Sequence, residues 1–269
     1  MDFLKSIMLG LVQGLSEFLP ISSSGHLVIF SDILNFHEEG VAFEVFVHFG
    51  TLLSILVAFR YELKKMVQAP FAVILSKTSD EELKEYFNWD LYIIVATIPA
   101  GIVGLLFKDQ IEQLFSSSLL VYCMLAVTGL IMVISPHLKS RNIKLTFKNT
   151  FIIGVAQAFA ILPGISRSGS TIFTGIAQGI DREKVARFSF LMSVPAIFGA
   201  VVLKVRDVLQ TSITSSEIIN YAAGTFVAFV SGYLAIIWLL DVVKKGKLQW
   251  FGYYCFVVSA LGLTWYFTR

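Results

Sequence analysis

Charged residues are scarce in this sequence of 269 residues. They make up 15% of it, whereas about a quarter is usual for a soluble globular domain. Hydrophobic residues reach 56%, and the mean hydropathy is +0.75. This balance excludes a disordered chain and a soluble globular domain. The net charge is only +2, and the 21 Lys and Arg residues are scattered through the links between apolar runs. A nucleic-acid partner is therefore excluded as well.

Cysteine is also rare, with only Cys123 and Cys255 in the whole chain. Both lie inside apolar stretches, and no CxxC spacing occurs. These facts exclude a disulfide framework and a zinc site built on cysteine pairs. What the chain has in abundance is long apolar sequence, so its natural unit is the bilayer crossing.

Six apolar runs are long enough, or nearly so, to cross about 30 Å of hydrocarbon as α-helices. They cover residues 41–59, 91–107, 119–135, 185–203, 218–240 and 250–267. Two further apolar regions, 7–34 and 151–180, are each interrupted by a proline and a Ser/Gly cluster. We expect each to be a broken pair of half-helices that enters the membrane and returns. The predicted fold is an all-α polytopic membrane protein with six transmembrane helices and two re-entrant segments, in a single membrane domain over 1–269.

The distribution of cations predicts the orientation. In this topology four short links fall on one side and hold fifteen Lys and Arg residues, against five on the other side. The cation-rich links are 60–90, 136–150, 181–187 and 241–249. Because Lys and Arg collect on the cytoplasmic side of membrane proteins, both termini are expected to face outward.

The two broken regions resemble each other when the chain is shifted by 144 residues. Identical pairs at this shift are Gly10 and Gly154, Gln13 and Gln157, Ile21 and Ile165, Ser22 and Ser166, Ser24 and Ser168, and Gly25 and Gly169. Three predicted crossings lie between the copies, and an odd number reverses their polarity. We therefore predict two inverted repeats, 1–135 and 136–269, whose broken segments meet in one central cavity. Two proline-kinked spanning helices are the alternative.

The first broken segment carries four residues suited to catalysis. Gln13 and Glu17 lie one helical turn apart and share a face. After the proline, Ser23 and His26 have i, i+3 spacing, which places a hydroxyl beside an imidazole. That arrangement activates a serine as a nucleophile, with histidine taking its proton. The reverse assignment, with His26 as the nucleophile, stays open.

The second broken segment contains Arg167, a cation at membrane depth. Burying an arginine there costs about 2.5 to 3.5 kcal/mol on insertion scales, so it requires a partner or an anionic ligand. A helix N-terminus and a planar guanidinium both suit phosphate, although a permanent ion pair with Glu17 is an alternative. Residues predicted to contact the anion, or merely to cap the half-helices, are Ser22, Ser24, Gly164, Ser166, Ser168 and Thr171.

Glu44 and His48 lie one turn apart in the predicted crossing 41–59. Ionisable groups inside a membrane generally face the bundle interior. We expect the pair to orient Glu17, His26 or a bound ion, and a purely structural hydrogen bond between the two is an equal alternative.

At these motifs the sequence closely resembles the undecaprenyl-diphosphate phosphatases, the bacitracin-resistance family of bacterial inner-membrane proteins. Gln13 and Glu17 match the family's (E/Q)-x-x-x-E pattern. Residues 20–26 match its P-x-S-S-x-G-H stretch, and residues 163–171 match its P-G-x-S-R-S-x-x-T motif. Gln13 is the neutral option of the first pattern, which argues against a mechanism that needs two carboxylates there.

The resemblance implies removal of the terminal phosphate of a C55 polyprenyl diphosphate. This recycles the lipid carrier of peptidoglycan synthesis on the periplasmic face of the inner membrane. It also implies a divalent cation, Mg²⁺ or Ca²⁺, for which Glu17 and Gln13 are the natural oxygen ligands. A transporter that flips the monophosphate lipid is the competing class, because inverted repeats with broken helices are a transporter architecture. The oligomeric state stays open between a monomer and a homodimer.

Overall fold

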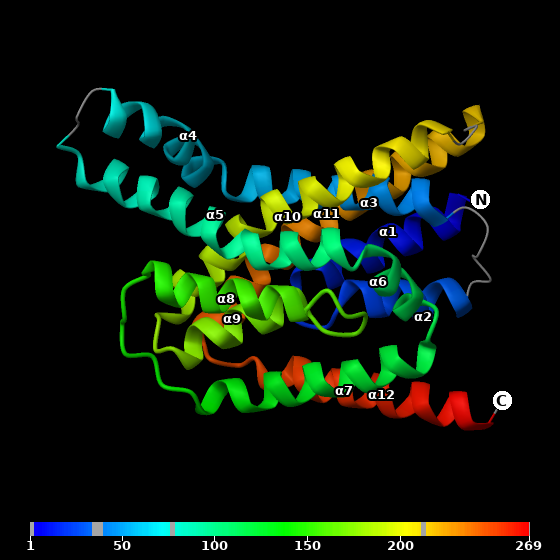
Figure 1. Cartoon of the computed structure of the whole chain (residues 1–269). Helices are drawn as coiled ribbons and strands as arrows, with labels where there is room; N and C mark the ends of the chain where they lie inside the picture. The colour runs from blue at the N-terminus through cyan, green and yellow to red at the C-terminus, as the bar shows by residue number, and fades with distance from the viewer. Residues whose placement is uncertain (1–2, 34–39, 76–78, 211–213, 269) are drawn as a thin grey trace.

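The structure, a computed structural model shown in Figure 1, is all-helical in the part of the chain that it describes, residues 3–33, 40–75, 79–210 and 214–268. The helices of the first half are α1 (Phe3–Phe18), α2 (Ser23–Ile33), α3 (Gly40–Ala58), α4 (Arg60–Ile74), α5 (Glu81–Leu106), α6 (Lys108–Phe115), α7 (Ser118–Ile134) and the 3₁₀ turn η1 (Ser135–His137). Those of the second half are α8 (Phe147–Phe159), α9 (Arg167–Ala177), α10 (Arg182–Gln210), α11 (Ser215–Lys244) and α12 (Gln249–Thr268). A single isolated bridge, Ile143 to Ile180, is the only β pairing among these residues.

Within the described residues, four helical stretches are long and apolar enough to cross a membrane: 81–106, 118–137, 182–204 and 217–244. The pair α3 and α4, bent by 79°, brings the number to five if it counts as one span. Large apolar side chains cover the outside of the bundle; for example, Leu261 and Trp265 of α12 are more than half exposed. A multi-pass membrane protein is thereby confirmed at the level of class, since such a surface suits lipid.

Each of the six predicted crossings corresponds to one helix, but α5 begins ten residues before the predicted run at 91. The reason is local. Asp80 caps this helix by accepting hydrogen bonds from the amides of Glu82 (2.9 Å) and Leu83 (3.4 Å), and acidic residues favour a first turn. The helix therefore extends into charged sequence that apolar periodicity does not detect.

Both predicted breaks are present. α1 ends at Phe18 and α2 begins at Ser23, while α8 ends at Phe159 and α9 begins at Arg167. Residue 34, the last of the first predicted broken segment, lies outside the described residues. The half-helix after each break is capped in the same way, because the hydroxyls of Ser22 and Ser166 accept the amides of Gly25 (3.3 Å) and Gly169 (3.1 Å).

The first half-helix of each broken segment packs closely on a long helix. A Cβ on Gly10 of α1 would lie 2.3 Å from the carbonyl oxygen of Gly224 in α11. A Cβ on Gly154 of α8 would lie 2.3 Å from the carbonyl oxygen of Ala96 in α5. Only glycine permits backbones to approach this closely, as in small-residue contacts between membrane helices.

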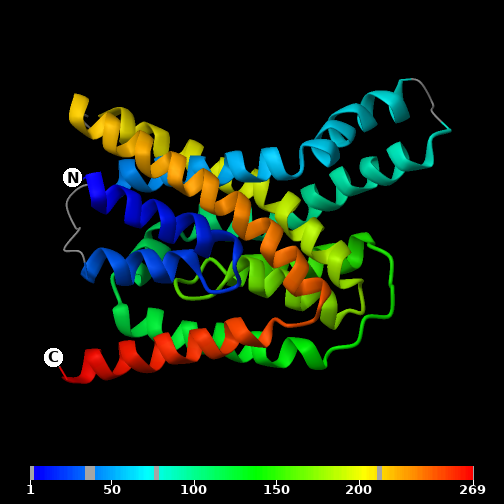
Figure 2. The same cartoon turned by 180° about the vertical axis from the view of Figure 1, so that it is seen from behind.

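The start of α1 and the end of α12 lie at the same end of the bundle, and the end of α4 and the start of α5 lie at the opposite end (Figures 1 and 2). Figure 2 also shows α11 crossing α1 along its length, in agreement with the close contact at Gly10. The core includes Phe18, the last residue of α1, and Phe190 of α10, whose ring centroids are 5.8 Å apart. Aromatic packing therefore anchors the start of the first break.

Candidate active site

The two breaks touch in the middle of the bundle, as the sequence predicts. A Cβ on Gly25 would lie 3.3 Å from the Cα of Gly164. The hydroxyl of Ser168 donates to the carbonyl of Leu19 at 3.4 Å. Some of the backbone N–H and C=O groups at the breaks that lack a partner within a helix thus find one in the other break. Non-helical backbone is tolerated at membrane depth when it is paired in this way.

Glu17 is the centre of the polar site. Its Oε1 accepts a hydrogen bond from Nη2 of Arg167 at 2.5 Å. Its Oε2 accepts from Oγ of Ser23 at 2.7 Å and from Nε2 of Gln13 at 2.9 Å. The Glu17 side chain is only 6% exposed, and a carboxylate this buried requires a countercharge and hydrogen-bond donors. The four residues predicted from two distant motifs therefore form one constellation.

Arg167 is the countercharge, and it is held at the first position of α9. Its side chain remains 20% exposed. Among the described residues, Nη2 is the only guanidinium nitrogen that donates a hydrogen bond. The other guanidinium N–H groups are therefore available to a second anion. The ion pair with Glu17, the alternative raised by the sequence, is present, and binding of a phosphate at the same guanidinium stays a prediction.

Among the described residues, Ser23 and His26 hydrogen-bond to other partners and not to each other. The Ser23 hydroxyl donates to Glu17, while Nδ1 of His26 lies 2.9 Å from the carbonyl oxygen of Ser22 and Nε2 lies 2.8 Å from the hydroxyl of Tyr254. Spacing of i, i+3 makes two residues neighbours on a helix, but it does not decide which acceptor a hydroxyl finds. A carboxylate offers a charge-assisted bond, and only folding brings α1 against the start of α2.

Tyr254 of α12 was missed by sequence reasoning. It sits in the predicted crossing 250–267 among other aromatic residues, and no motif distinguishes it from a residue that anchors the helix at the membrane interface. Thr128 of α7 was missed for the same reason. Its hydroxyl donates to the carbonyl of Gly164 at 2.8 Å and accepts the amide of Ser166 at 3.0 Å. An isolated polar residue inside an apolar run is the only signal for Thr128.

The start of α9 presents open amides. The amides of Ser166 and Gly169 already have acceptors, which are the hydroxyls of Thr128 and Ser166. The backbone amides of Arg167 and Ser168 have no hydrogen-bond acceptor among the described residues. Because α9 also directs the positive end of its dipole toward the break, these two amides and the guanidinium can bind one anion together.

Several residues predicted to contact phosphate have local structural contacts instead. The hydroxyls of Ser22 and Ser24 lie 3.2 Å apart, as do those of Ser166 and Ser168. Ser22 and Ser166 are the helix caps described above, and both are almost fully buried. Direct contact of these four hydroxyls with a phosphate stays a prediction.

Gly164 and Thr171 also serve the fold. Gly164 has a φ of +95° and fits against the carbonyl oxygen of Val121, where a Cβ would approach to 2.4 Å. Glycine is required there for both reasons. Thr171 is fully buried, and its hydroxyl lies 2.6 Å from that of Ser189 in α10. Contact of either residue with a phosphate stays a prediction, and we give neither a part in the reaction below.

Glu44 and His48 have different positions. Nδ1 of His48 donates to the backbone carbonyl of Glu44 at 2.7 Å, and its Nε2 lies 3.9 Å from Oε2 of Glu17. The Glu44 carboxylate instead accepts a bond from Lys204 of α10 at 2.6 Å. His48 thus lies near Glu17 and also makes a structural hydrogen bond to Glu44, which was the alternative. An orienting role for the pair stays a prediction, and the Glu44 carboxylate pairs with a cation that the sequence analysis did not connect with it.

The residues expected to hold a divalent cation offer few ligands. Oε1 of Gln13 is a buried oxygen without a hydrogen-bond partner among the described residues, and it belongs to the side chain that donates to Glu17. Those same residues contain no cluster of three His, Cys, Asp or Glu side chains that could enclose a metal. The pair therefore fits a hard cation that takes its remaining ligands from phosphate oxygens and water, as Mg²⁺ commonly does.

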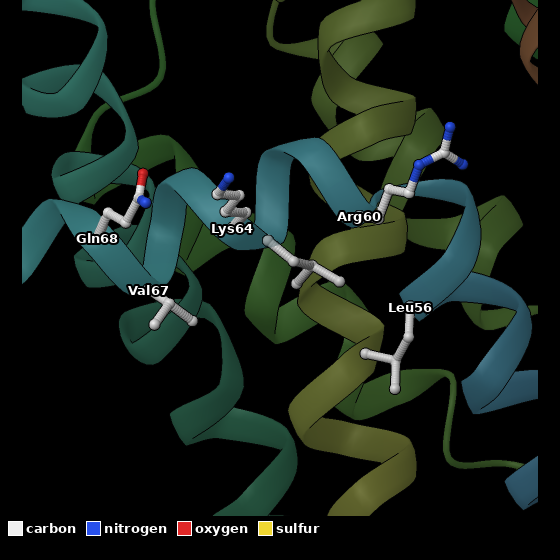
Figure 3. Close-up of a pocket in the computed structure, with 6 residues that line it drawn as sticks. Leu56, Arg60, Lys64, Val67 and Gln68 are labelled. Carbon is white, nitrogen blue, oxygen red and sulfur yellow. The ribbon is translucent and has the colours of Figure 1, made fainter.

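A separate hollow lies at the bend between α3 and α4 (Figure 3). Its lining residues are Leu56, Arg60, Leu63, Lys64, Val67 and Gln68. None of them contacts the constellation around Glu17, and the hollow is open to the surroundings rather than enclosed. We therefore place the candidate active site where the two breaks meet, and not in this hollow.

Comparison with known proteins agrees with this geometry. The family model described as Bacitracin resistance protein BacA matches residues 6–261, which include both broken segments. The chain belongs to this family. Two relatives are each named undecaprenyl-diphosphatase. The protein of Halothermothrix orenii is 42% identical over 97% of both chains, and that of Christiangramia forsetii is 44% identical over 96% of both. The resemblance to the bacitracin-resistance family is thereby confirmed.

Proposed function

We propose that this protein is an undecaprenyl-diphosphatase, an integral membrane hydrolase that converts undecaprenyl diphosphate into undecaprenyl phosphate and inorganic phosphate. Relatives that carry this name cover nearly the whole chain. The observation that carries the proposal is the hydrogen-bonded series of Arg167, Glu17 and Ser23, which joins residues 150 positions apart. It combines a nucleophile, a proton acceptor and a phosphate-binding cation. The reaction recycles the lipid carrier of peptidoglycan synthesis.

The first step uses Ser23 as the nucleophile. Its Oγ bonds to the terminal phosphorus as the bridging P–O bond breaks, and undecaprenyl phosphate departs. The proton of the hydroxyl passes to Glu17, whose Oε2 already accepts it at 2.7 Å. The guanidinium of Arg167 and the amides of Arg167 and Ser168 hold the phosphate oxygens as charge builds up on them.

The second step restores the enzyme. A water oxygen bonds to phosphorus as the Ser23 Oγ–P bond breaks, and Glu17 returns its proton to Oγ. Both protons of the water leave on inorganic phosphate as dihydrogen phosphate. Atoms and charge therefore balance, and Glu17 ends in the ionised form that pairs with Arg167.

A divalent cation bound by Glu17, Gln13 and the diphosphate would neutralise charge on the phosphate oxygens. Gln13 would contribute Oε1, which has no hydrogen-bond partner among the described residues, and its amide N–H donates to Glu17 at 2.9 Å. The roles of Ser23 as nucleophile and Glu17 as proton acceptor do not depend on these ligands.

His26 is the less favoured nucleophile. Attack by an imidazole requires a free lone pair, and both ring nitrogens of His26 are engaged, one by Ser22 and the other by Tyr254. The Ser23 hydroxyl, by contrast, is at the start of α2 and half-buried. These contacts support a phosphoserine rather than a phosphohistidine intermediate.

The finer architecture is part of the proposal. Six crossings and two re-entrant segments, arranged as inverted repeats over 1–135 and 136–269, are supported by the matching contacts of Gly10 and Gly154 and by the matching caps. A site open to the outside of the inner membrane is supported by a polar track. It leads from Glu17 past His48 to the pair of Glu44, near the start of α3, and Lys204, in the last two turns of α10. Figure 1 shows the start of α3 and the end of α10 at the same end of the bundle as the start of α1.

Trapping the phosphoenzyme tests the reaction. Purified protein in detergent is quenched during turnover of a prenyl diphosphate labelled in its terminal phosphate, and the modified residue is identified by mass spectrometry. We expect label on Ser23 in the native protein and in a Ser22→Ala control, and no label in Ser23→Ala. Label on His26 would overturn the assignment, and label on neither residue would favour direct attack by water. Absence of phosphate release in detergent would instead favour the transporter class.

A further inference from the structure

The hydrogen bonds of His26 determine where its proton lies. Nδ1 is 2.9 Å from the backbone carbonyl oxygen of Ser22, and a carbonyl oxygen can only accept. Nδ1 therefore carries a hydrogen. In a neutral imidazole the other nitrogen, Nε2, must then be an acceptor, so the Tyr254 hydroxyl at 2.8 Å is the donor. His26 is 3% exposed, and burial favours this neutral form.

The backbone conformation of Ser22 positions its carbonyl for the hydrogen bond with Nδ1 of His26. Ser22 has a φ of 71°, in the left-handed region that residues other than glycine rarely adopt. This turned peptide directs its carbonyl at both the amide of His26 (3.1 Å) and Nδ1 of the same residue. A strained residue held in place at a candidate active site is a sign of a geometry that the fold enforces.

Tyr254 contacts the His26 ring from the opposite end of the sequence. It lies on α12, 228 positions from His26. The two rings are nearly parallel, at 13°, with centroids 5.5 Å apart. The next residue, Cys255, is buried with its thiol 4.0 Å from the carbonyl oxygen of Pro20. α12 is therefore seated against the first break, and the tyrosine has a defined place there.

We propose that Tyr254 is a positioning residue for the phosphatase reaction: it holds His26 as the neutral Nδ1–H tautomer, with Nε2 directed at α12. This inference rests on the proposed function. A neutral His26 leaves Arg167 as the cation that serves Glu17 and the phosphate, and leaves Glu17 as the acceptor for the proton of Ser23. The imidazole then supports the start of α2, where the nucleophile lies, instead of competing for that proton.

Tyr254→Phe removes the hydroxyl and keeps the ring, and Tyr253→Phe is the matched control. Tyr253 is the neighbouring residue on α12 and has a similar exposed fraction, 49% against 42% for Tyr254, but it packs edge-on against Trp250 instead of against His26. We expect Tyr254→Phe to lower kcat about 10- to 100-fold, the range usual when an orienting partner of a histidine is lost, with KM nearly unchanged. Tyr253→Phe should behave as the native protein. Equal losses in both variants, or native kcat in Tyr254→Phe, would overturn the proposal.

A spectroscopic readout separates positioning from general damage and does not depend on turnover. The chain has four histidines, so nitrogen NMR of selectively labelled protein, with His26→Gln for assignment, reports the His26 tautomer directly. We expect the Nδ1–H form in the native protein and a mixture of tautomers in Tyr254→Phe. An Nε2–H form in the native protein would overturn the inference even if the phosphatase activity is as proposed. Lack of phosphatase activity with the expected tautomer would overturn the proposed function alone.

Discussion

The two broken segments share a backbone scaffold and differ in chemistry. In each, a serine caps the second half-helix and lies 3.2 Å from the serine two positions on: Ser22 with Ser24, and Ser166 with Ser168. In each, a residue on another helix approaches the carbonyl at the break. Thr128 donates to Gly164 at 2.8 Å, and the Cys255 thiol lies 4.0 Å from the oxygen of Pro20.

At three positions the segments diverge in the groups that matter for catalysis. At the shift of 144 residues, Glu17 corresponds to Ile161, Ser23 to Arg167, and His26 to Ser170. The first segment therefore holds the proton acceptor and the nucleophile, while the second holds the cation. Neither segment alone could hold a buried carboxylate and a phosphate, because each needs a positive partner at this depth. Two segments with similar backbone structure can therefore each supply different functional groups of a single site.

The largest effect is expected from the carboxylate that joins the two segments. Glu17→Gln removes the acceptor of the Ser23 proton and leaves Arg167 without its ion-pair partner. We expect phosphate release to fall about 10³- to 10⁴-fold, a loss in the upper range for removal of a general base combined with a disrupted buried pair. Initial rates in detergent measure it. Glu44→Gln is the matched control, since that carboxylate pairs with Lys204, and its rate should stay within about threefold of native. Loss of equal size in both would refute the central place of Glu17.

The cation of the second segment should tolerate even a conservative change poorly. Arg167→Lys keeps the charge but replaces a planar fork with a point charge. We expect about a 10²-fold loss of kcat/KM, of the size seen when one donor to a transition-state oxyanion is removed. Arg187 offers a comparison away from the breaks: it pairs with Glu62 and Glu183, and Arg187→Lys should retain nearly full rate. Near-native turnover in Arg167→Lys would contradict shared binding of carboxylate and phosphate by one guanidinium.

The smallest effects should come from the supports behind the two breaks, and they should differ. Thr128→Val leaves the carbonyl of Gly164 and the amide of Ser166 without partners, at an expected cost of about 1 to 3 kcal/mol in the free energy of unfolding. Cys255→Ala loses a weak and long contact and should lower the thermal midpoint less. Thermal unfolding in detergent ranks the two variants. The opposite ranking would show that the first break depends more on its neighbour than the second does.

Much of this protein could be read from local pattern. Long apolar runs predicted the membrane class, and proline followed by a Ser/Gly cluster predicted both interruptions. The repeat indicated that Glu17 and Arg167 would meet, because two segments of opposite polarity must bury their irregular backbone against each other. The early start of α5 was not predicted from the apolar runs. Capping by Asp80 extends this helix into charged sequence, where hydrophobicity does not indicate a helix.

The order of residues along the chain is enough to say which residue types occur at the breaks and which of them lie one turn apart. Their hydrogen-bond partners depend on how the helices pack: Ser23 with Glu17, His26 with Tyr254, and Glu44 with Lys204. The reason is geometric. Helical spacing sets neighbours within about a turn, whereas a hydrogen bond between helices depends on distances of a few tenths of an ångström that the packing of whole helices sets.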